Sequence, residues 1–219
     1  MEKIKMFFKS LWAHRIFKII TWAFLILVIL YFILVGFRVK YFFDLDKTNA
    51  QVEKIHATKL TLDDVMGTNL PPEPGALADK TVQGIDANNN GIRDDVELAV
   101  FQKYPNSAKT RAVLLQYALA LQMEFMQPIV NTTITTEVIT ENSRGHTCIG
   151  DVLVPRKDIE SSRSSAEVNK IYEYIDFIEN KQFNTDARKK ANQDFYKNLR
   201  SYGESTNKVC DIDISKLQN

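Results

Sequence analysis

The longest uncharged stretch in this chain of 219 residues runs from Ile19 to Phe37 and reads IITWAFLILVILYFILVGF. At about 1.5 Å of rise per residue it makes a helix of roughly 28 Å, close to the hydrocarbon thickness of a bilayer. A cleaved signal peptide has a shorter apolar core followed by small residues, whereas here the bulky and charged sequence RVKYFFDLD follows. The pattern favours an uncleaved signal anchor that crosses the membrane once.

The charges around this anchor predict its orientation. Five basic residues precede it, against the single acidic residue Glu2; they are Lys3, Lys5, Lys9, Arg15 and Lys18. Basic flanks stay in the cytoplasm, so residues 1–18 are predicted to be a cytoplasmic tail and 19–37 the transmembrane signal anchor. We therefore expect a protein of the inner (plasma) membrane whose C-terminal part is periplasmic or otherwise extracytoplasmic.

Beyond the anchor the charge balance changes sign. From residue 38 onward the chain has 23 Lys and Arg residues and 26 Asp and Glu residues, a formal net charge of −3. Nucleic-acid-binding domains carry a clustered basic surface and a clear positive excess. The composition therefore argues against nucleic acid, and the partners we expect are the membrane and a protein that the sequence does not identify.

Two cysteines, Cys148 and Cys210, lie on the exported side of the anchor. An even number in an oxidising compartment favours one disulfide. It would close a loop of about 60 residues and contribute roughly 4 kcal/mol in the chain-entropy account of disulfide stabilisation. Two free thiols are the alternative, and the sequence HTC also leaves open a Cys148 nucleophile with His146 as its base.

The rest of the chain reads as mainly α, with residues 38–75 as a stalk or linker and 76–219 as a small exported helical domain. The stalk ends in the breaker cluster NLPPEPG. Hydrophobic periodicity and capping residues predict four helices. They are a short one in VELAVFQKY, a strongly apolar one after Ser107 that Pro128 ends or kinks, one capped by Ser164 and Glu167, and one from about Thr185 to Gly203 that buries Phe195, Tyr196, Leu199 and Tyr202.

Residues 129–154 give conflicting signals. The sequence IVNTTITTEVIT is rich in β-branched residues, whose propensity favours a strand. It directly follows a helix, however, and no hairpin partner is evident. We expect a helical continuation here, with the following NSRGHTCIG as a loop.

The stretch DANNNGIRDDVE, from Asp86 to Glu97, follows the spacing Asp-x-Asn-x-Asn-Gly-x₅-Glu of calcium-binding loops. It resembles an EF-hand-type loop, in particular the dockerin-type loop–helix form of secreted bacterial proteins, over these residues only. The resemblance implies calcium as the cofactor and a sharp turn at Gly91. It implies as ligands the side chains of Asp86, Asn88, Asn90, Asp94 and Glu97 and the backbone carbonyl of Ile92.

Arg93 departs from the EF-hand pattern, because paired EF-hands carry an aliphatic residue at this eighth position. We therefore expect no β-bridge to a second loop, and a single site with neutral asparagines is expected to bind weakly, with Kd of about 10⁻⁴–10⁻³ M as in extracellular modules. The alternative is a metal-free turn, in which Asp94, Asp95 and Glu97 favour the start of a helix. Asp95 is interpreted as such a helix-start residue and not as a ligand.

The common catalytic motifs are missing from the sequence, which has no Walker loop, dinucleotide-binding glycine pattern, HExxH or GxSxG. The leading hypothesis is a membrane-anchored envelope protein whose calcium-stabilised helical domain acts in protein interaction or structural support. The alternative is an exported metal-dependent hydrolase or transferase that uses Asp86, Asp94 and Glu97 in catalysis. That role needs an open coordination position beside a cleft.

Overall fold

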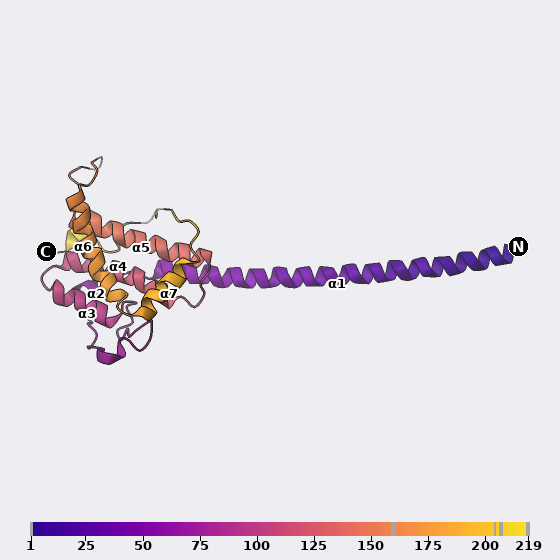
Figure 1. Ribbon diagram of the computed structural model, residues 1–219, viewed down its shortest axis with the longest axis horizontal. Coiled ribbons are helices and arrows are strands. Elements are labelled where there is room, and N and C mark those ends of the chain that lie inside the picture. Colours follow the sequence, from indigo (N-terminus) through magenta and orange to yellow (C-terminus); the bar gives the residue numbers. More distant parts are fainter. Residues whose placement is uncertain (1, 159–160, 204, 206–207, 218–219) are drawn as a thin grey trace. The chain divides into compact units, whose positions relative to one another are not determined.

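A computed structural model describes residues 2–158, 161–203, 205 and 208–217 of the chain (Figure 1). These residues are mainly helical and contain no strand. The α-helices are α1 (Glu2–Ala57), α2 (Leu62–Met66), α3 (Asp94–Lys103), α4 (Ala108–Met126), α5 (Thr132–Leu153), α6 (Ser165–Gln182) and α7 (Asp186–Tyr196); the 3₁₀ helices are η1 (Gly75–Leu77) and η2 (Ile214–Lys216). The chain divides into two compact units, residues 1–49 and 50–219.

Unit 1 is the greater part of α1. The helix is long and apolar enough to cross a membrane, and none of its most apolar 18-residue stretch is buried within the protein. It does not end where the predicted span ends, since residues 38–49 remain helical and extend it by about 18 Å. Residues 50–75, part of the predicted stalk, belong to unit 2, where Ile55, Leu60 and Val65 are buried.

Helix α4 is the centre of unit 2. Every residue from Thr110 to Phe125 is buried, and α2, α3, α5, α6 and α7 all contact this helix (Figure 1). Its N-terminus is capped by the Ser107 hydroxyl, which accepts a hydrogen bond from the Thr110 amide at 3.2 Å. The strongly apolar helix predicted from the sequence is thus confirmed, and it ends at Met126, before Pro128.

Residues 132–153 form the helix α5, so the helical expectation for this stretch is confirmed. A short break after Met126 separates it from α4, and the Asn131 side chain caps its start. The prediction of a loop at NSRGHTCIG was wrong, because α5 continues through this segment. A Cβ at Gly145 would lie 3.0 Å from the Cα of Tyr117, so this glycine allows α5 to approach α4 closely and does not mark a turn.

The last two helices begin where they were predicted. Ser164 and Glu167 form a capping box at the start of α6, and Thr185 caps α7. The predicted end near Gly203 was wrong, because α7 ends at Tyr196. Of the four residues predicted to be buried by this helix, Phe195 is buried and Leu199 is half-buried. Tyr196 and Tyr202 are 39% and 50% exposed. Leu199 and Tyr202 lie beyond the end of α7, where the helical period no longer applies.

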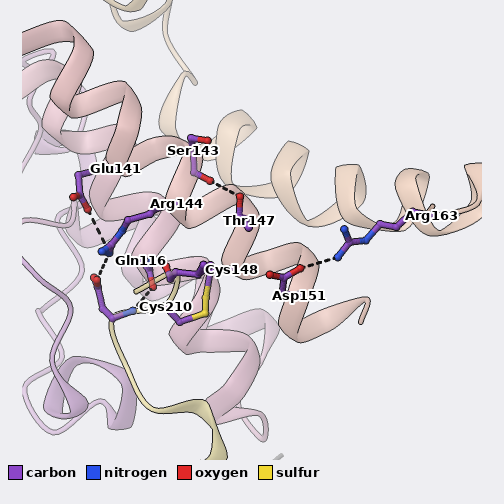
Figure 2. Close-up of a disulfide and its surroundings, with 11 residues drawn as sticks. Gln116, Glu141, Ser143, Arg144, Thr147, Cys148, Asp151, Arg163 and Cys210 are labelled. Carbon is purple, nitrogen blue, oxygen red and sulfur yellow. Dashed lines mark hydrogen bonds and ion pairs between the residues drawn. A yellow bond between two sulfur atoms is a disulfide. The ribbon is translucent and has the colours of Figure 1, made fainter. Parts of the chain in front are cut away.

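Cys148 and Cys210 form a disulfide, with Cα atoms 5.3 Å apart (Figure 2). The predicted pairing is confirmed, and Cys148 is no free nucleophile. The disulfide fastens the C-terminal segment, residues 208–217, to α5. Gln116 of α4 fastens the same segment through two hydrogen bonds, donating to the Val209 carbonyl at 2.9 Å and accepting from the Asp211 amide at 2.8 Å.

A buried charged cluster surrounds this attachment (Figure 2). Arg144 of α5 pairs with Glu141 and with Asp211, and Lys59 donates to Glu141 at 2.7 Å. The Arg144, Glu141 and Asp211 side chains are each 4–6% exposed. Because opposite charges alternate, each buried ion has a partner, and the C-terminal segment is joined to both α5 and the start of unit 2.

Candidate metal site in the Asp86–Glu97 loop

The Asp86–Glu97 loop is closed by its own polar side chains. The two carboxylate oxygens of Asp86 accept hydrogen bonds from the backbone amides of Asn90 at 3.1 Å and Gly91 at 2.9 Å. Asn90 Oδ1 accepts from the Ile92 amide at 2.9 Å. Gly91 has φ of 84°, a left-handed conformation that glycine adopts without strain. The turn expected at Gly91 is therefore present.

The second half of the loop enters α3 and is buried. Asp94 is the first residue of the helix, and Asp94 and Glu97 are each 1% exposed. Asp94 Oδ1 accepts from the Ala87 amide at 2.9 Å, which joins the two ends of the loop. Ile92 is fully buried in the apolar core. Asp95 lies in the first turn of α3, as expected for a helix-start residue.

Several buried polar atoms of the loop have no hydrogen-bond partner. They are Asn88 Oδ1, Asp94 Oδ2 and Asn90 Nδ2. Leaving such an atom unsatisfied costs about 1–3 kcal/mol. Asn88 Nδ2 donates to Glu97 Oε2 at 3.1 Å, so these two predicted ligands lie in contact. Two of the unpartnered atoms are oxygens that the resemblance assigns to calcium.

Burial also disfavours the charged forms of the Asp94 and Glu97 carboxyl groups. Burial raises the pKa of Glu97 to about 7, although the Asn88 and Asn90 side chains lower it, and the charges of Asp64 and Asp94 raise it further. Burial likewise raises the pKa of Asp94; the Ala87 amide opposes this effect, and Asp86 and Asp95 add to it. A hard divalent cation would supply the missing positive charge and accept the unpartnered oxygens. The residues present thus fit such an ion.

Among the described residues, no three His, Cys, Asp or Glu side chains gather into a metal-binding group. The predicted donor set does not depend on such a group, because it combines carboxylates with two asparagine amides and a backbone carbonyl. Asp86 belongs to it by sequence spacing, and its two oxygens already orient the loop backbone. An ionised carboxylate retains further lone pairs for a cation.

Arg93 fastens the loop to the end of α6. Its guanidinium group is fully buried and donates to the Asp95 carboxylate at 2.5 and 2.9 Å. It also donates to the backbone carbonyls of Lys181 at 2.6 Å and Gln182 at 3.1 Å. These carbonyls belong to the last turn of α6, where a cation is favourable. The residue that departs from the EF-hand pattern thus joins the loop to its own domain, a role that sequence reasoning missed.

Arg188 of α7 holds the segment that leads into the loop. Its guanidinium group is fully buried and donates to the carbonyls of Ala78, Thr81 and Val82 and to the Asp79 carboxylate. No local pattern in the sequence distinguishes Arg188 from the exposed Lys189 and Lys190 beside it. The approach to the loop is therefore positioned by long-range contacts.

A second polar cluster lies where α5 and α7 pack against α4. Glu124 is 4% exposed, and its carboxylate accepts from Asn142 at 3.2 Å and Asn192 at 2.5 Å. Burial raises the pKa of Glu124 to about 7, the two asparagines lower it, and Glu179 raises it further. Glu179 accepts a hydrogen bond from the Tyr117 hydroxyl at 2.7 Å. These contacts join four helices through ionisable groups.

Comparisons of the chain with protein-family models, with curated proteins and with solved structures found no match.

Replacing Arg93 by lysine should lower the free energy of unfolding by about 2–4 kcal/mol, because lysine keeps the charge but lacks the planar fork that reaches both a carboxylate and two carbonyls. Thermal unfolding of the full chain in detergent micelles, followed by circular dichroism, measures the loss. Lys189→Met is the control, since its ion pair with Asp186 is exposed and should change stability by less than about 0.5 kcal/mol. Equal effects of the two substitutions would contradict the role assigned to Arg93.

Glu124 should make the stability of unit 2 depend on pH. Its pKa is about 7 in the folded chain, above its ordinary value of 4.5, so its contribution is fully present below about pH 4.5 and is lost as pH rises through 7. The total loss is up to about 3 kcal/mol. Between pH 5 and 8, the thermal stability of Glu124→Gln should depend less on pH than that of the original chain. Glu97 titrates in both proteins, so its contribution cancels in the comparison. Parallel profiles would show that Glu124 is not buried as described.

Proposed function

We propose that this protein is anchored in the inner (plasma) membrane by one span and carries an exported helical domain that calcium stabilises. The domain acts in protein interaction or structural support at the membrane surface. Calcium binding is supported by the oxygen-rich loop, in which the buried atoms Asn88 Oδ1 and Asp94 Oδ2 have no hydrogen-bond partner and Glu97 is 1% exposed.

The donor chemistry favours calcium over other ions. All the predicted ligands are oxygens, as hard cations require, and the resemblance to EF-hand loops implies Glu97 as a bidentate ligand. Magnesium demands a tighter octahedron and tends to keep its waters, whereas calcium tolerates the irregular set that a flexible loop provides. When bound, the ion supplies positive charge to Asp94 and Glu97, whose ionised forms are otherwise disfavoured by burial.

The enclosure of the ligands favours a stabilising role over the metal-dependent hydrolase or transferase. Asp94 and Glu97 are each 1% exposed, so a substrate would not reach an ion between them without opening the loop. Opening would also break the contacts of Arg93 with the end of α6. A metal that fastens the start of α3 to the residues before it is consistent with the burial of these two carboxylates and with the attachment of Arg93 to α6.

The location is supported by α1 and by the cysteines. The basic residues before the apolar segment favour a cytoplasmic N-terminus, and α1 is long and apolar enough to span the bilayer. The Cys148–Cys210 disulfide fits an oxidising compartment on the far side. An anchored helical domain on that side of the membrane could bind another envelope component.

Calcium should raise the thermal stability of the full chain in detergent micelles. At 10 mM calcium, and with Kd of about 10⁻⁴–10⁻³ M, linkage predicts a gain of about 1.4–2.7 kcal/mol relative to a chelator. Glu97→Gln keeps the volume of the side chain and removes its charge, so this variant should lose the calcium response while remaining as stable as the original chain without calcium.

Glu173→Gln is the matched control, because Glu173 is an exposed acid on α6 and its loss should leave the calcium response unchanged. A calcium effect of the same size in Glu97→Gln would refute the loop as the binding site. No calcium effect in the original chain would leave the loop as a metal-free turn.

Protease treatment of sealed membrane vesicles tests the anchor. In right-side-out vesicles, externally added protease should degrade the part beyond residue 38 and leave a protected N-terminal fragment, because the basic flank holds residues 1–18 inside. In inverted vesicles unit 2 should survive. The reverse pattern would overturn the orientation, and a mature protein that begins after residue 37 would identify the apolar segment as a cleaved signal peptide.

A further inference from the structure

Resting on the proposed calcium site, we infer that Asn88 couples calcium occupancy to the position of the proline segment, residues 67–75, in addition to acting as a ligand. Asn88 is the third residue of the loop, a place where the resemblance assigns only a ligand oxygen. The structure shows that its amide nitrogen and its oxygen serve different neighbours.

The nitrogen of the Asn88 side chain bridges two elements. It donates to the backbone carbonyl of Asn69 at 2.9 Å and to Glu97 Oε2 at 3.1 Å. The oxygen of the same amide, Oδ1, is buried without a partner. One planar group thus presents a free oxygen to the proposed ion while its nitrogen holds the backbone of the proline segment.

The proline segment has few other hydrogen bonds. Turn bonds at its N-terminal end join Gly67 and Thr68 to α2, and bonds at its C-terminal end form η1. In the described part of the chain, the bond from Asn88 is the hydrogen bond that joins the middle of this segment to another element. Pro71, Pro72 and Pro74 have no amide hydrogen to donate. Pro71 is buried, but the hydrogen bonding of the middle of the segment to the rest of the domain depends on the orientation of one side chain.

Calcium would fix that orientation. An ion on Asn88 Oδ1 restricts the rotation of the amide and polarises it, so that its N–H groups become stronger donors. The Asn69 carbonyl is then held more firmly. The segment carries Leu70, which is 41% exposed, and Leu77 follows it with 49% exposed, so the ion would set how these apolar side chains are displayed.

Asn88→Asp separates the ligand role from the coupling role. Calcium loops accept either Asp or Asn at this third position, so the variant keeps a ligand oxygen. It loses the amide donor, and a carboxylate oxygen then faces the Asn69 carbonyl. Asn89→Asp is the matched control, since Asn89 occupies the next, unspecified position of the loop, is exposed, and makes only a 3.5 Å contact with the Ala87 carbonyl.

The experiment uses a nitroxide spin label on Glu73→Cys, an exposed position within the proline segment, in the full chain in detergent micelles. Label mobility and thermal stability are measured on the same samples with calcium and with chelator. In the otherwise unchanged chain, and in Asn89→Asp, we expect calcium to lower the mobile population of the label about twofold, because it strengthens one existing hydrogen bond by a fraction of its usual net contribution. In Asn88→Asp we expect calcium to stabilise the domain with no change in mobility.

The outcomes separate the two proposals. Calcium stabilisation without any change of label mobility in the original chain overturns the coupling and leaves the calcium site intact. A mobility change that persists in Asn88→Asp also overturns it, because the signal would then reach the segment by another route. Absence of any calcium effect on stability or mobility overturns the calcium site and the coupling together.

Discussion

The polar side chains of α4 must find hydrogen-bond partners inside the domain, because protein surrounds this helix on all sides. Three of them thereby fix chain segments that surround the helix. Arg111 donates to the Val65 carbonyl at the end of α2 at 3.0 Å, and Gln116 binds the C-terminal segment. Gln122 donates to the Gln83 carbonyl at 2.7 Å, just before the loop. The burial of one helix thus dictates the arrangement of chain segments that have no regular structure of their own.

The candidate metal site inherits its position from this arrangement. Gln122 and Arg188 fix the residues before the loop, and Arg93 ties its end to α6. An ion that enters such a loop has less backbone to order than it would in a free peptide, so less of its binding free energy is lost to conformational entropy. A single loop without an EF-hand partner can in this way obtain from its own domain the support that a second loop supplies elsewhere.

Local patterns were enough to predict the apolar segment of α1, the buried helix α4, the cap at Ser164, the start of α7 near Thr185 and the turn at Gly91, because each is set by neighbours within a few residues. They were insufficient for the second half of α5, where NSRGHTCIG suggested a loop but the helix continues and Gly145 packs closely against α4. Arg93 could not be understood locally either. Its partners are backbone carbonyls 88 and 89 positions away. Every residue carries a backbone carbonyl, so no sequence pattern marks these two.

The bond between the Leu60 amide and Asp211 Oδ2, 3.2 Å long and 151 residues apart in sequence, brings the last part of unit 2 against its first. For a chain that crosses a membrane from its N-terminus, in the orientation proposed above, this contact must wait until residue 211 has emerged. Until then Gln116 and the core around Cys148 remain uncovered. Completion of this part of the fold is thereby tied to the emergence of residue 211, and contacts of such long range also slow folding. The two cysteines can pair only after residue 210 has emerged, so a chain cut short before Cys210 would keep Cys148 as a free thiol and lack the segment that covers Gln116.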